Sequence, residues 1–380
     1  MSPRIALVYD RVNTPYGGAE KVLLALHQAF PQAPLFTAVF HPRAVWAKIF
    51  KIKTSFLQKV PFANQLHRFF VPLMPLAFES LDLSMYDIII SVTSAEAKGI
   101  ITRPNQLHVC YMLTPTRYLY SHRAHYEQTH WPFKIPLLNF FSRKLFDYLT
   151  WWDQVAAQRP DVIIPISGLV KKRIEKYYQR AVSDVIYPPV DLNEQKTKKD
   201  LEKYRPANLP NEYYLIISRL VPYKRVDLAI QACQILNKNL VIIGEGPQKT
   251  ELKKLANHHT YFIGNVTNLV RQAIMSQTKA LLMPGIEDFG ITAIEAVLSD
   301  IPVILHEKSG ASELFQNHRV GLYLTNLSVN SLVKTIKKLE SSRLEFAPLK
   351  IKLRKYAIND FTRRFQTTVF KIYKQQKGRS

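Results

Sequence analysis

The stretch that decides the fold is PGIEDFGITAIEAVLSDIPVIL, which runs from Pro284 to Leu305. It follows the apolar run ALLM at 280–283, and its helical pattern extends from about Ile291 to the turn at Ser299 and Asp300. A second apolar run comes next. The pattern therefore predicts a strand, a loop, a helix and a strand, the unit from which parallel sheets covered by helices are built.

Two carboxylates of this stretch, Glu287 and Glu295, are candidate ligand-binding groups. Glu295 falls on an otherwise apolar helix, where an unpaired carboxylate is costly, so we expect a hydrogen-bonding partner for it. Gly290 lets a ligand approach the backbone, and the free N–H groups of a helix start favour oxygen-rich ligands. The alternative is that Glu287 and Asp288 are ordinary acids near a helix N-terminus and that Glu295 pairs with an arginine.

Length and composition bound the function. The 380 residues exceed the size at which one core usually stops growing, so we expect two domains. Lys and Arg outnumber Asp and Glu by 52 to 29, and this excess predicts an anionic partner: nucleic acid, anionic lipid or a phosphorylated substrate. Cys110 and Cys233 lie in apolar segments, which predicts no disulfide framework and fits a reducing cytoplasm. The N-terminus is typical of a strand rather than a signal peptide, and no apolar run reaches the roughly 18 residues of a membrane span.

Strands and helices alternate in two sets, which predicts two doubly wound α/β domains. The first domain fills residues 1–190, and residues 191–212, which are polar and lack a periodic pattern, are predicted to be a linker. The second domain fills residues 213–350, and residues 351–380 are predicted to form cationic helices. Gly17 and Gly18 precede the first helix, where backbone N–H groups can face phosphate or sugar oxygens.

Two cationic side chains follow the first strand of the second domain. Arg219 can bind two phosphate oxygens with its planar guanidinium, and Lys224 supplies a point charge. They lie in the first loop of this domain, whereas Glu287 lies in the fifth. Crossover connections can bring both loops to the carboxyl ends of the strands, where such sheets bind ligands.

The segment from Arg43 to Pro75 combines six Lys or Arg with aromatic residues and contains no acid. Cationic groups with aromatic anchors are typical of an interfacial membrane-binding segment, at about 1 kcal/mol per basic residue near an anionic leaflet. The same mixture can stack on and neutralise single-stranded nucleic acid. In a third interpretation, some of the aromatics belong to a core and the lysines are merely solvated.

Several motifs resemble retaining family-4 glycosyltransferases of the GT-B fold. In the second half these are ISRLVPYKRVDLAIQA, IGEGPQ, YFIGNV and PGIEDFGITAIEAVLSDIPVI. In the first half, YDRVNTPYGGAEKVL, TSFLQKVP, VPLMPLAFESLDLSMYDIIISVTSAEAKGI and YMLTPTRYLY resemble the subgroup that transfers mannose or related sugars onto bacterial surface polysaccharides. The resemblance implies two Rossmann-like domains that face each other across a cleft, with the helices of 351–380 crossing back to the first domain.

The resemblance also implies roles for individual residues. Arg219 and Lys224 match the pair that neutralises a leaving nucleoside diphosphate. Glu287 matches the first acid of an E-x7-E motif, which holds sugar hydroxyls, and Glu295 matches the second, which binds ribose. The catalytic residues are then Arg219, Lys224 and Glu287, and the donor-binding set adds Gly17 and Gly18 beside the diphosphate, Val266 and Asn268 facing the base, and Asp288, Phe289, Gly290 and Glu295.

One motif departs from the family pattern. The subgroup usually reads Y-x-H-T-P-x-R, whereas this chain has Leu113 in the place of the His. That His normally contacts the donor sugar, and Leu113 cannot form a hydrogen bond. Either the sugar lacks the hydroxyl, as a 6-deoxy sugar would, or another group serves, or activity is reduced. Leu113, Thr114 and Arg117 form the predicted acceptor or sugar pocket.

The function implied by the resemblance is retaining transfer of a hexose, mannose or a related sugar, from a nucleotide sugar, with a GDP-sugar favoured. The acceptor is expected to be a lipid-linked saccharide in cell-surface polysaccharide synthesis, and the protein to be cytoplasmic and peripheral on the anionic inner face of the membrane. We expect no cofactor and no metal, because two cations can do the work of a divalent ion.

Two alternatives remain open. The net charge of +23 suggests a nucleic-acid-binding protein, although the chain has no zinc-ligand spacing and no RNP-like run, so no nucleic acid is expected. Leu113 suggests a degenerate transferase that binds its donor without turnover.

Overall fold

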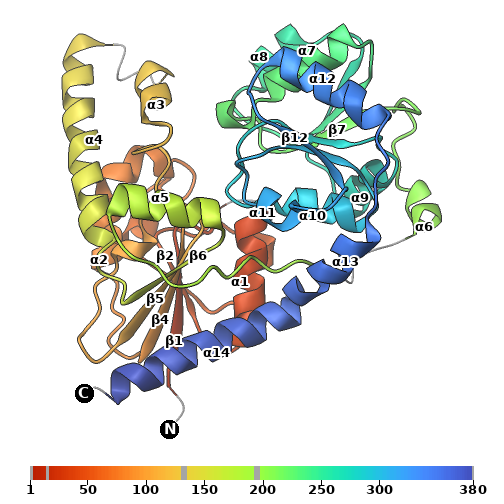
Figure 1. Cartoon of the computed structure of the whole chain (residues 1–380). Coiled ribbons are helices and arrows are strands. Elements are labelled where there is room, and N and C mark those ends of the chain that lie inside the picture. Colours follow the sequence, from red (N-terminus) through yellow and green to blue (C-terminus); the bar gives the residue numbers. More distant parts are fainter. Residues whose placement is uncertain (1–2, 14–16, 130–134, 192–196, 379–380) are drawn as a thin grey trace. The chain divides into compact units, whose positions relative to one another are not determined.

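The computed structural model describes residues 3–13, 17–129, 135–191 and 197–378, and it divides the chain into two compact units (Figure 1). Unit 1 comprises Met1–Pro189 together with Asn359–Ser380, and unit 2 comprises Val190–Ile358. Each unit has a parallel sheet of its own, with helices around it.

The sheet of unit 1 has six parallel strands in the order β3-β2-β1-β4-β5-β6. The strands are β1 Ile5–Tyr9, β2 Leu35–Thr37, β3 Ile52–Thr54, β4 Ile88–Thr93, β5 Leu107–Met112 and β6 Val162–Pro165. All residues of β4 and β5 are buried, as expected for central strands that are covered on both faces. The strand order reverses between β1 and β4, which is where doubly wound sheets bind ligands.

The helices of unit 1 include one that comes from the end of the chain. They are α1 Gly18–Ala29, α2 Met74–Glu79, α3 Arg123–Thr129, α4 Pro136–Ala156, α5 Gly168–Tyr178 and α14 Ile358–Lys377. In α14, the rings of Phe361 and Phe365 contact Tyr111 of β5 at centroid distances of 6.0 and 5.5 Å. Residues 359–380 therefore belong to unit 1, whereas residues 351–358 belong to unit 2.

The sheet of unit 2 also has six parallel strands, in the order β12-β11-β10-β7-β8-β9. The strands are β7 Tyr214–Ile217, β8 Leu240–Ile243, β9 Thr260–Gly264, β10 Leu281–Met283, β11 Val303–His306 and β12 Gly321–Leu324. The helices are α6 Lys198–Glu202, α7 Val226–Ile235, α8 Lys249–Leu255, α9 Asn268–Ser276, α10 Ile291–Leu298, α11 Ser312–Phe315, α12 Val329–Glu340 and α13 Ala347–Leu353. Two doubly wound α/β sheets confirm the predicted fold class, and in this one the order reverses between β7 and β10.

The range 191–212, predicted to be a linker, is different in the structure. Its described residues from 197 onward belong to unit 2 and include α6. Thr197 caps the N-terminus of this helix, because its hydroxyl accepts a hydrogen bond from the Asp200 N–H at 3.2 Å. Leu201 and Leu209 are only 3% and 5% exposed. No sign of this appears in the sequence, because two isolated leucines form no periodic pattern. Their burial nevertheless anchors this polar segment to the domain.

Two helices are long, α4 with 21 residues and α14 with 20. Neither these nor any other helix in the described ranges combines the length and the apolar character needed to traverse a bilayer.

Candidate functional site

The loops that follow β7 and β10 meet at the carboxyl ends of these neighbouring strands. A Cβ atom at Gly285, just after β10, would clash with the Tyr223 carbonyl oxygen and the Lys224 backbone. Only glycine permits this approach, because it has no side chain. The loops after the first and fourth strands of unit 2, which carry the predicted cations and the predicted acid, therefore lie at one rim of the sheet. The Glu287 loop is thus the fourth strand-end loop and not the fifth, as was expected from the sequence.

Lys224 and Glu287 form an ion pair across these two loops. The Lys224 Nζ donates a hydrogen bond to Glu287 Oε1, and the two side chains are 16% and 13% exposed. The Glu287 backbone is also fixed, because its N–H donates to Ser309 Oγ at 3.1 Å and its carbonyl accepts from the Gly310 N–H at 2.9 Å. The carboxylate and the ammonium are thus held in place before any ligand binds.

Arg219 contributes a second cation, in the same loop as Lys224. Its backbone segment is anchored by the Leu220 N–H, which donates to the Glu245 carbonyl at 3.0 Å. Its side chain is exposed, and within the described part of the chain the guanidinium makes no hydrogen bond or ion pair. Because Lys224 is already paired with Glu287, Arg219 gives this rim an unbalanced positive charge that suits an anionic ligand.

The start of α10 completes the rim. Gly290 precedes the helix with φ of 99°, a conformation that favours glycine, and no side chain caps the helix N-terminus. Asp288 and Phe289 are 7% and 4% exposed, and the Phe289 carbonyl accepts from the Ala311 N–H at 2.5 Å. The N–H groups of the first turn therefore lie in a well-anchored loop and can bind oxygen atoms.

Glu295 has the hydrogen-bonding partner that its apolar surroundings require. Arg271 Nη1 donates to Glu295 Oε2 at 2.5 Å, and the side chains are 17% and 13% exposed. The same guanidinium donates to Asn268 Oδ1 through Nη2 at 2.6 Å and through Nε at 3.1 Å. Arg271 thus joins two predicted donor-binding residues, Glu295 and Asn268, while Val266 lies half-buried two residues before Asn268.

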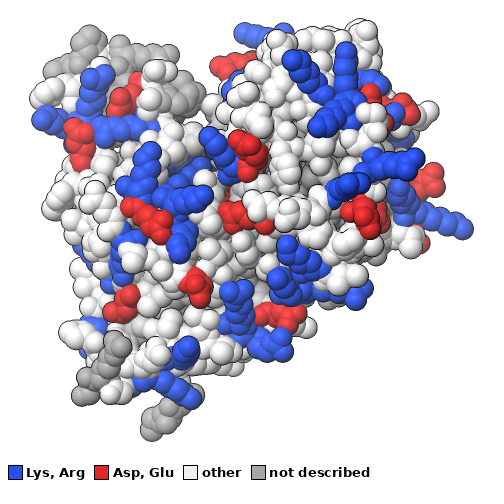
Figure 2. Space-filling view, in the orientation of Figure 1, with Lys and Arg blue, Asp and Glu red and all other residues white. Residues whose placement is uncertain are grey.

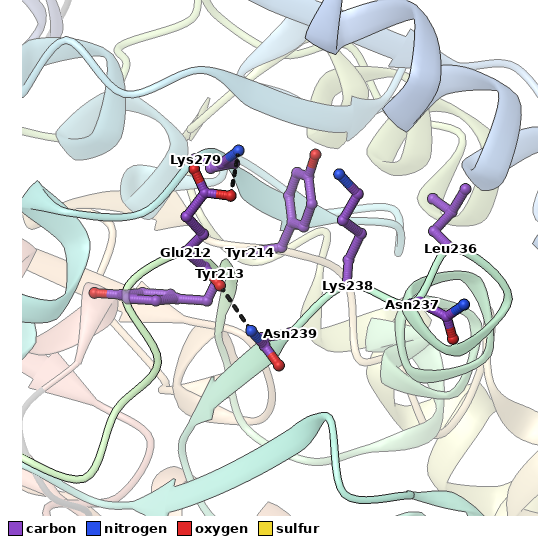
Figure 3. A pocket seen from close by; sticks show the side chains of 8 residues that line it. All are labelled: Glu212, Tyr213, Tyr214, Leu236, Asn237, Lys238, Asn239 and Lys279. Carbon is purple, nitrogen blue, oxygen red and sulfur yellow. Dashed lines mark hydrogen bonds and ion pairs between the residues drawn. The ribbon is translucent and has the colours of Figure 1, made fainter.

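A pocket of about 340 Å³ opens at the other edge of the same sheet, where strands β7, β8 and β10 begin (Figure 3). It is lined by Glu212, Tyr213, Tyr214, Leu236, Asn237, Lys238, Asn239 and Lys279. In it Lys279 pairs with Glu212 at 2.8 Å. None of the predicted site residues lines this pocket, and doubly wound sheets bind ligands at their carboxyl edge, so the rim around Lys224 remains our candidate site.

In unit 1, Gly17 and Gly18 lie at the carboxyl end of β1, beside the reversal of strand order. Gly17 is the residue before α1, and no side-chain hydrogen bond caps the helix there. A Cβ at Gly17 would come within 3.0 Å of Glu20, a buried carboxylate that accepts a hydrogen bond from the Tyr9 hydroxyl at 3.0 Å. Burial and the Glu20 charge raise the pKa of Tyr9 well above its ordinary value, so Tyr9 remains a neutral donor.

The predicted sugar pocket of unit 1 follows β5. The Leu113 N–H donates to the Thr93 carbonyl at 2.8 Å, and the Leu113 side chain is half-buried. Thr114 is 4% exposed and accepts from Arg173 at 3.5 Å, whereas Arg117 is half-buried. The loop is therefore fixed on the sheet beside β4, the strand that borders the reversal of strand order.

The comparisons with known proteins assign the second unit to a family. Residues 197–360 match the family model described as glycosyl transferases group 1. This region is therefore similar to group 1 glycosyltransferases. It contains every predicted donor-binding residue except Gly17 and Gly18.

Similar proteins include characterised glycosyltransferases. The GDP-mannose-dependent alpha-(1-6)-phosphatidylinositol monomannoside mannosyltransferase of Mycobacterium tuberculosis is 28% identical over 203 residues, which cover 47% of this chain and 52% of that enzyme. The poly(ribitol-phosphate) alpha-N-acetylglucosaminyltransferase of Staphylococcus aureus is 26% identical over 38% of this chain and 32% of that enzyme. The chain thus spans about half of the first relative and a third of the second.

Solved structures extend the likeness to both units. Anabaena Alr3699/HepE in complex with UDP and glucose is 17% identical, and the match covers 97% of this chain and 99% of that one with a TM-score of 0.72. At this identity the match establishes the fold, which is the GT-B fold of glycosyltransferases.

Two groups of residues in the described structure were not predicted from the sequence. One is Arg271. Its contact with Asn268 had a sequence signal, because the two are three residues apart on one helix, but its contact with Glu295 had none. The other is a buried network in unit 1, around Lys98 and Asp153, which are 0% and 1% exposed. Asp153 lies in a helix rich in apolar residues, so a hydrogen-bonding partner could have been expected for it as for Glu295.

The network fixes the loops of unit 1. Asp153 Oδ1 accepts from Lys98 Nζ at 2.5 Å and from the Thr116 hydroxyl at 2.7 Å. Its Oδ2 accepts from the hydroxyls of Tyr178 at 2.8 Å and Tyr120 at 3.1 Å. Four elements, namely the loop after β4, the loop after β5, α4 and α5, are thereby tied to one carboxylate, and the loop with the predicted sugar pocket is one of them.

Proposed function

We propose that this protein is a retaining glycosyltransferase that moves a hexose from a nucleotide sugar to an acceptor hydroxyl. The observation that carries the proposal is the rim of unit 2. There the Lys224–Glu287 ion pair, the exposed Arg219 and the start of α10 lie at the strand ends of the region that matches group 1 glycosyl transferases. A cationic rim with free backbone N–H groups suits a diphosphate.

The chemistry proposed for this rim is electrostatic. The bond from the sugar C1 to the diphosphate oxygen breaks, the acceptor hydroxyl forms a new bond to C1 on the same face, and its proton passes to a phosphate oxygen of the leaving group. Arg219 and Lys224 offset the negative charge that grows on the diphosphate, a role in which no metal or other cofactor is needed. Because Glu287 already holds Lys224, little reorganisation is required when this charge develops.

The remaining residues bind the two ends of the donor. Glu287 and the backbone N–H groups of Asp288, Phe289 and Gly290 hold the sugar hydroxyls. Glu295 binds the ribose, and Arg271 orients its carboxylate. In unit 1, Gly17 and Gly18 are proposed as diphosphate-binding residues, and Leu113, Thr114 and Arg117 as residues that bind the sugar or acceptor.

We propose mannose or a related sugar, carried by GDP, as the donor. The mycobacterial relative is named as GDP-mannose-dependent, and Leu113, which cannot form a hydrogen bond, suits a sugar that lacks a hydroxyl, such as a 6-deoxy sugar.

The acceptor proposed is a lipid-linked saccharide of cell-surface polysaccharide synthesis, reached at the cytoplasmic face of an anionic membrane. The mycobacterial relative is named for a lipid, phosphatidylinositol monomannoside. The basic segment from Arg43 to Pro75 also supports a membrane partner. Two of its aromatics, Phe62 and Phe69, are each 68% exposed, whereas Phe50 is 6% exposed and contacts His27. The segment is thus divided between surface and core.

A panel of nucleotide sugars tests the proposal. We expect one of the GDP-, UDP- or dTDP-sugars to raise the melting temperature, since a ligand at 100 times its Kd adds about 2.7 kcal/mol to the free energy of unfolding. The Arg219→Ala variant is the control and should lose this shift. Stabilisation by oligonucleotides but by no nucleotide sugar would contradict the proposal, and stabilisation without release of nucleoside diphosphate would identify a transferase that binds without turnover.

Arg271 allows a sharper test of the nucleoside end. We expect Arg271→Ala to weaken binding of GDP or UDP by about tenfold, because Glu295 loses the hydrogen bonds that orient it, and such charged hydrogen bonds contribute about 1.5–3 kcal/mol. The corresponding 2′,3′-dideoxynucleotides, measured by titration calorimetry, should be weakened much less. An equal loss of affinity for both kinds of nucleotide would mean that Arg271 only supports the fold. The control is Lys350→Ala, which removes an exposed ion pair with Asp300 and should leave nucleotide affinity unchanged.

A further inference from the structure

The outer face of α4 carries a stripe of large apolar side chains. Phe140, Phe141, Tyr148, Trp151 and Val155 are 58%, 60%, 47%, 59% and 41% exposed. Phe141, Tyr148, Trp151 and Val155 are seven, three and four residues apart, and Phe140 precedes Trp151 by eleven residues. All five therefore lie on one side of the helix, over about four turns. Single exposed apolar side chains are normal, but a continuous stripe of this size marks an interaction surface. We call these five residues the α4 stripe.

The stripe has no covering element among the described residues. Within it the rings contact each other, Phe140 with Phe141 at 5.7 Å and Tyr148 with Trp151 at 6.0 Å between centroids. The opposite face of α4 is firmly packed, because Leu149, Trp152 and Asp153 are 2%, 4% and 1% exposed. The helix, which lies along one edge of unit 1 in Figure 1, therefore presents the stripe outward as part of a fixed structure.

The packed face explains why α4 cannot simply turn its stripe inward. Trp152 Nε1 donates to Glu79 Oε1 at 2.7 Å, and a Cβ at Gly99 would clash with the Trp152 ring, so this side is in close contact with α2 and the loop after β4. Asp153 is bound by Lys98, as described above. Rotating the helix would break these buried bonds and leave the buried Lys98 charge without its partner.

The charges beside the stripe are positive and unbalanced. Arg143 and Lys144 are exposed, and in the described ranges Arg143 has no acidic partner, while Lys144 lies 5.9 Å over the Phe140 ring. The one exposed acid of α4, Asp147, is bound by Arg123 at 2.6 Å. Aromatic rings beside unpaired cations suit the interface of an anionic membrane, where the rings enter the headgroup region and the cations meet lipid phosphates.

We propose that the α4 stripe is a membrane-docking surface that inserts into the headgroup region of anionic lipid. A second copy of the chain fits this surface less well. Lys and Arg outnumber Asp and Glu by 28 to 13 in unit 1, so a symmetric contact would bring like charges together. Figure 2 shows more Lys and Arg than Asp and Glu on the visible face. The inference deepens the proposed membrane-borne acceptor, and it gives the docking role to a helix outside the Arg43 to Pro75 segment.

Vesicle sedimentation of the full chain, without nucleotide sugar, tests this inference separately from sugar transfer. We expect binding to phosphatidylcholine vesicles that contain 30% phosphatidylglycerol, weaker binding to pure phosphatidylcholine, and weaker binding at high salt. The double substitution Phe141→Glu and Trp151→Glu should reduce the affinity for anionic vesicles by about tenfold or more, because two rings that insert into the headgroup region are lost. Ile235→Glu, at a 61% exposed position of α7 in unit 2, is the matched control and should bind like the wild type.

Two further measurements keep the outcomes distinct. The Arg143→Gln and Lys144→Gln variant should lose much of the salt dependence but keep part of the binding. Wild-type affinity in the Phe141→Glu and Trp151→Glu variant would overturn the proposal, provided that circular dichroism shows it to be folded. Light scattering that shows a dimer in the wild type and a monomer in this variant would also overturn it, since the stripe would then bind a second copy.

Discussion

Replacing Lys224 with alanine is expected to lower kcat for sugar transfer by about a hundredfold or more. The ammonium is proposed to offset charge on the leaving diphosphate, a contribution of about 3 to 4 kcal/mol for one well-placed donor. Its pairing with Glu287 adds to the effect, because the substitution also leaves that carboxylate without its cation at a largely buried position. Arg219→Ala should give a similar loss. The measurement is the rate of nucleoside diphosphate release at saturating donor.

The matched control for this prediction is Lys279→Ala. Lys279 also pairs with a glutamate in unit 2, Glu212 at 2.8 Å, but at the amino edge of the sheet. Its removal should leave kcat within about twofold of the wild type, since an exposed ion pair contributes about 0–1 kcal/mol. If Lys224→Ala and Arg219→Ala were both folded and both turned over donor at the wild-type rate, the assignment of these cations would be wrong.

Replacing Lys98 with methionine is expected to lower the free energy of unfolding of unit 1 by about 3–5 kcal/mol, because it leaves the buried Asp153 charge without its cation. Thr116, Tyr120 and Tyr178 remain as hydrogen-bond donors, but they carry no charge. Tryptophan fluorescence during urea unfolding measures the effect, since all four tryptophans of the chain belong to unit 1.

Two further variants serve as controls for the stability measurement. Arg4→Met breaks an exposed pair with Asp87, at 3.5 Å, and should cost no more than about 1 kcal/mol. The double variant Lys98→Met and Asp153→Leu should recover much of the lost stability, because no unpaired charge remains. A loss in Lys98→Met as small as that in Arg4→Met would show that the network contributes little.

The regular elements were largely predictable from the sequence, because buried strands and amphipathic helices leave periodic apolar patterns. The helix after Gly290 is an example: it was expected from about Ile291 to the turn at Ser299, and α10 runs from Ile291 to Leu298. The need for a partner at Glu295 was also predictable, since burial makes an unpaired carboxylate costly. The rim around Lys224 followed from the rule that parallel strands bring their following loops to one edge.

The features that depend on contacts between distant residues could not be predicted. Arg271 is 24 residues from Glu295, and nothing in a single sequence specifies which of many arginines reaches this carboxylate. The same holds for Lys98 and Asp153, which are 55 residues apart. In the Arg43 to Pro75 segment, Phe50 is buried and Phe69 is exposed although both are phenylalanines. This difference could not be predicted, because the short 3₁₀ helices of the segment leave no periodic apolar pattern in the sequence. The apolar stripe of α4 could not be predicted either. Apolar residues lie on both the buried and the exposed face of this helix, and the sequence does not show which of them are exposed.

The central claim is that a nucleotide binds at the carboxyl edge of the unit 2 sheet, and backbone amide hydrogen exchange with GDP or UDP tests it most directly. The predicted result is slower exchange in peptides that cover residues 218–225 and 285–296, with no change at residues 236–239, which line the pocket at the amino edge. Slower exchange confined to residues 236–239, with the loops of Lys224 and Glu287 unaffected, would contradict the account.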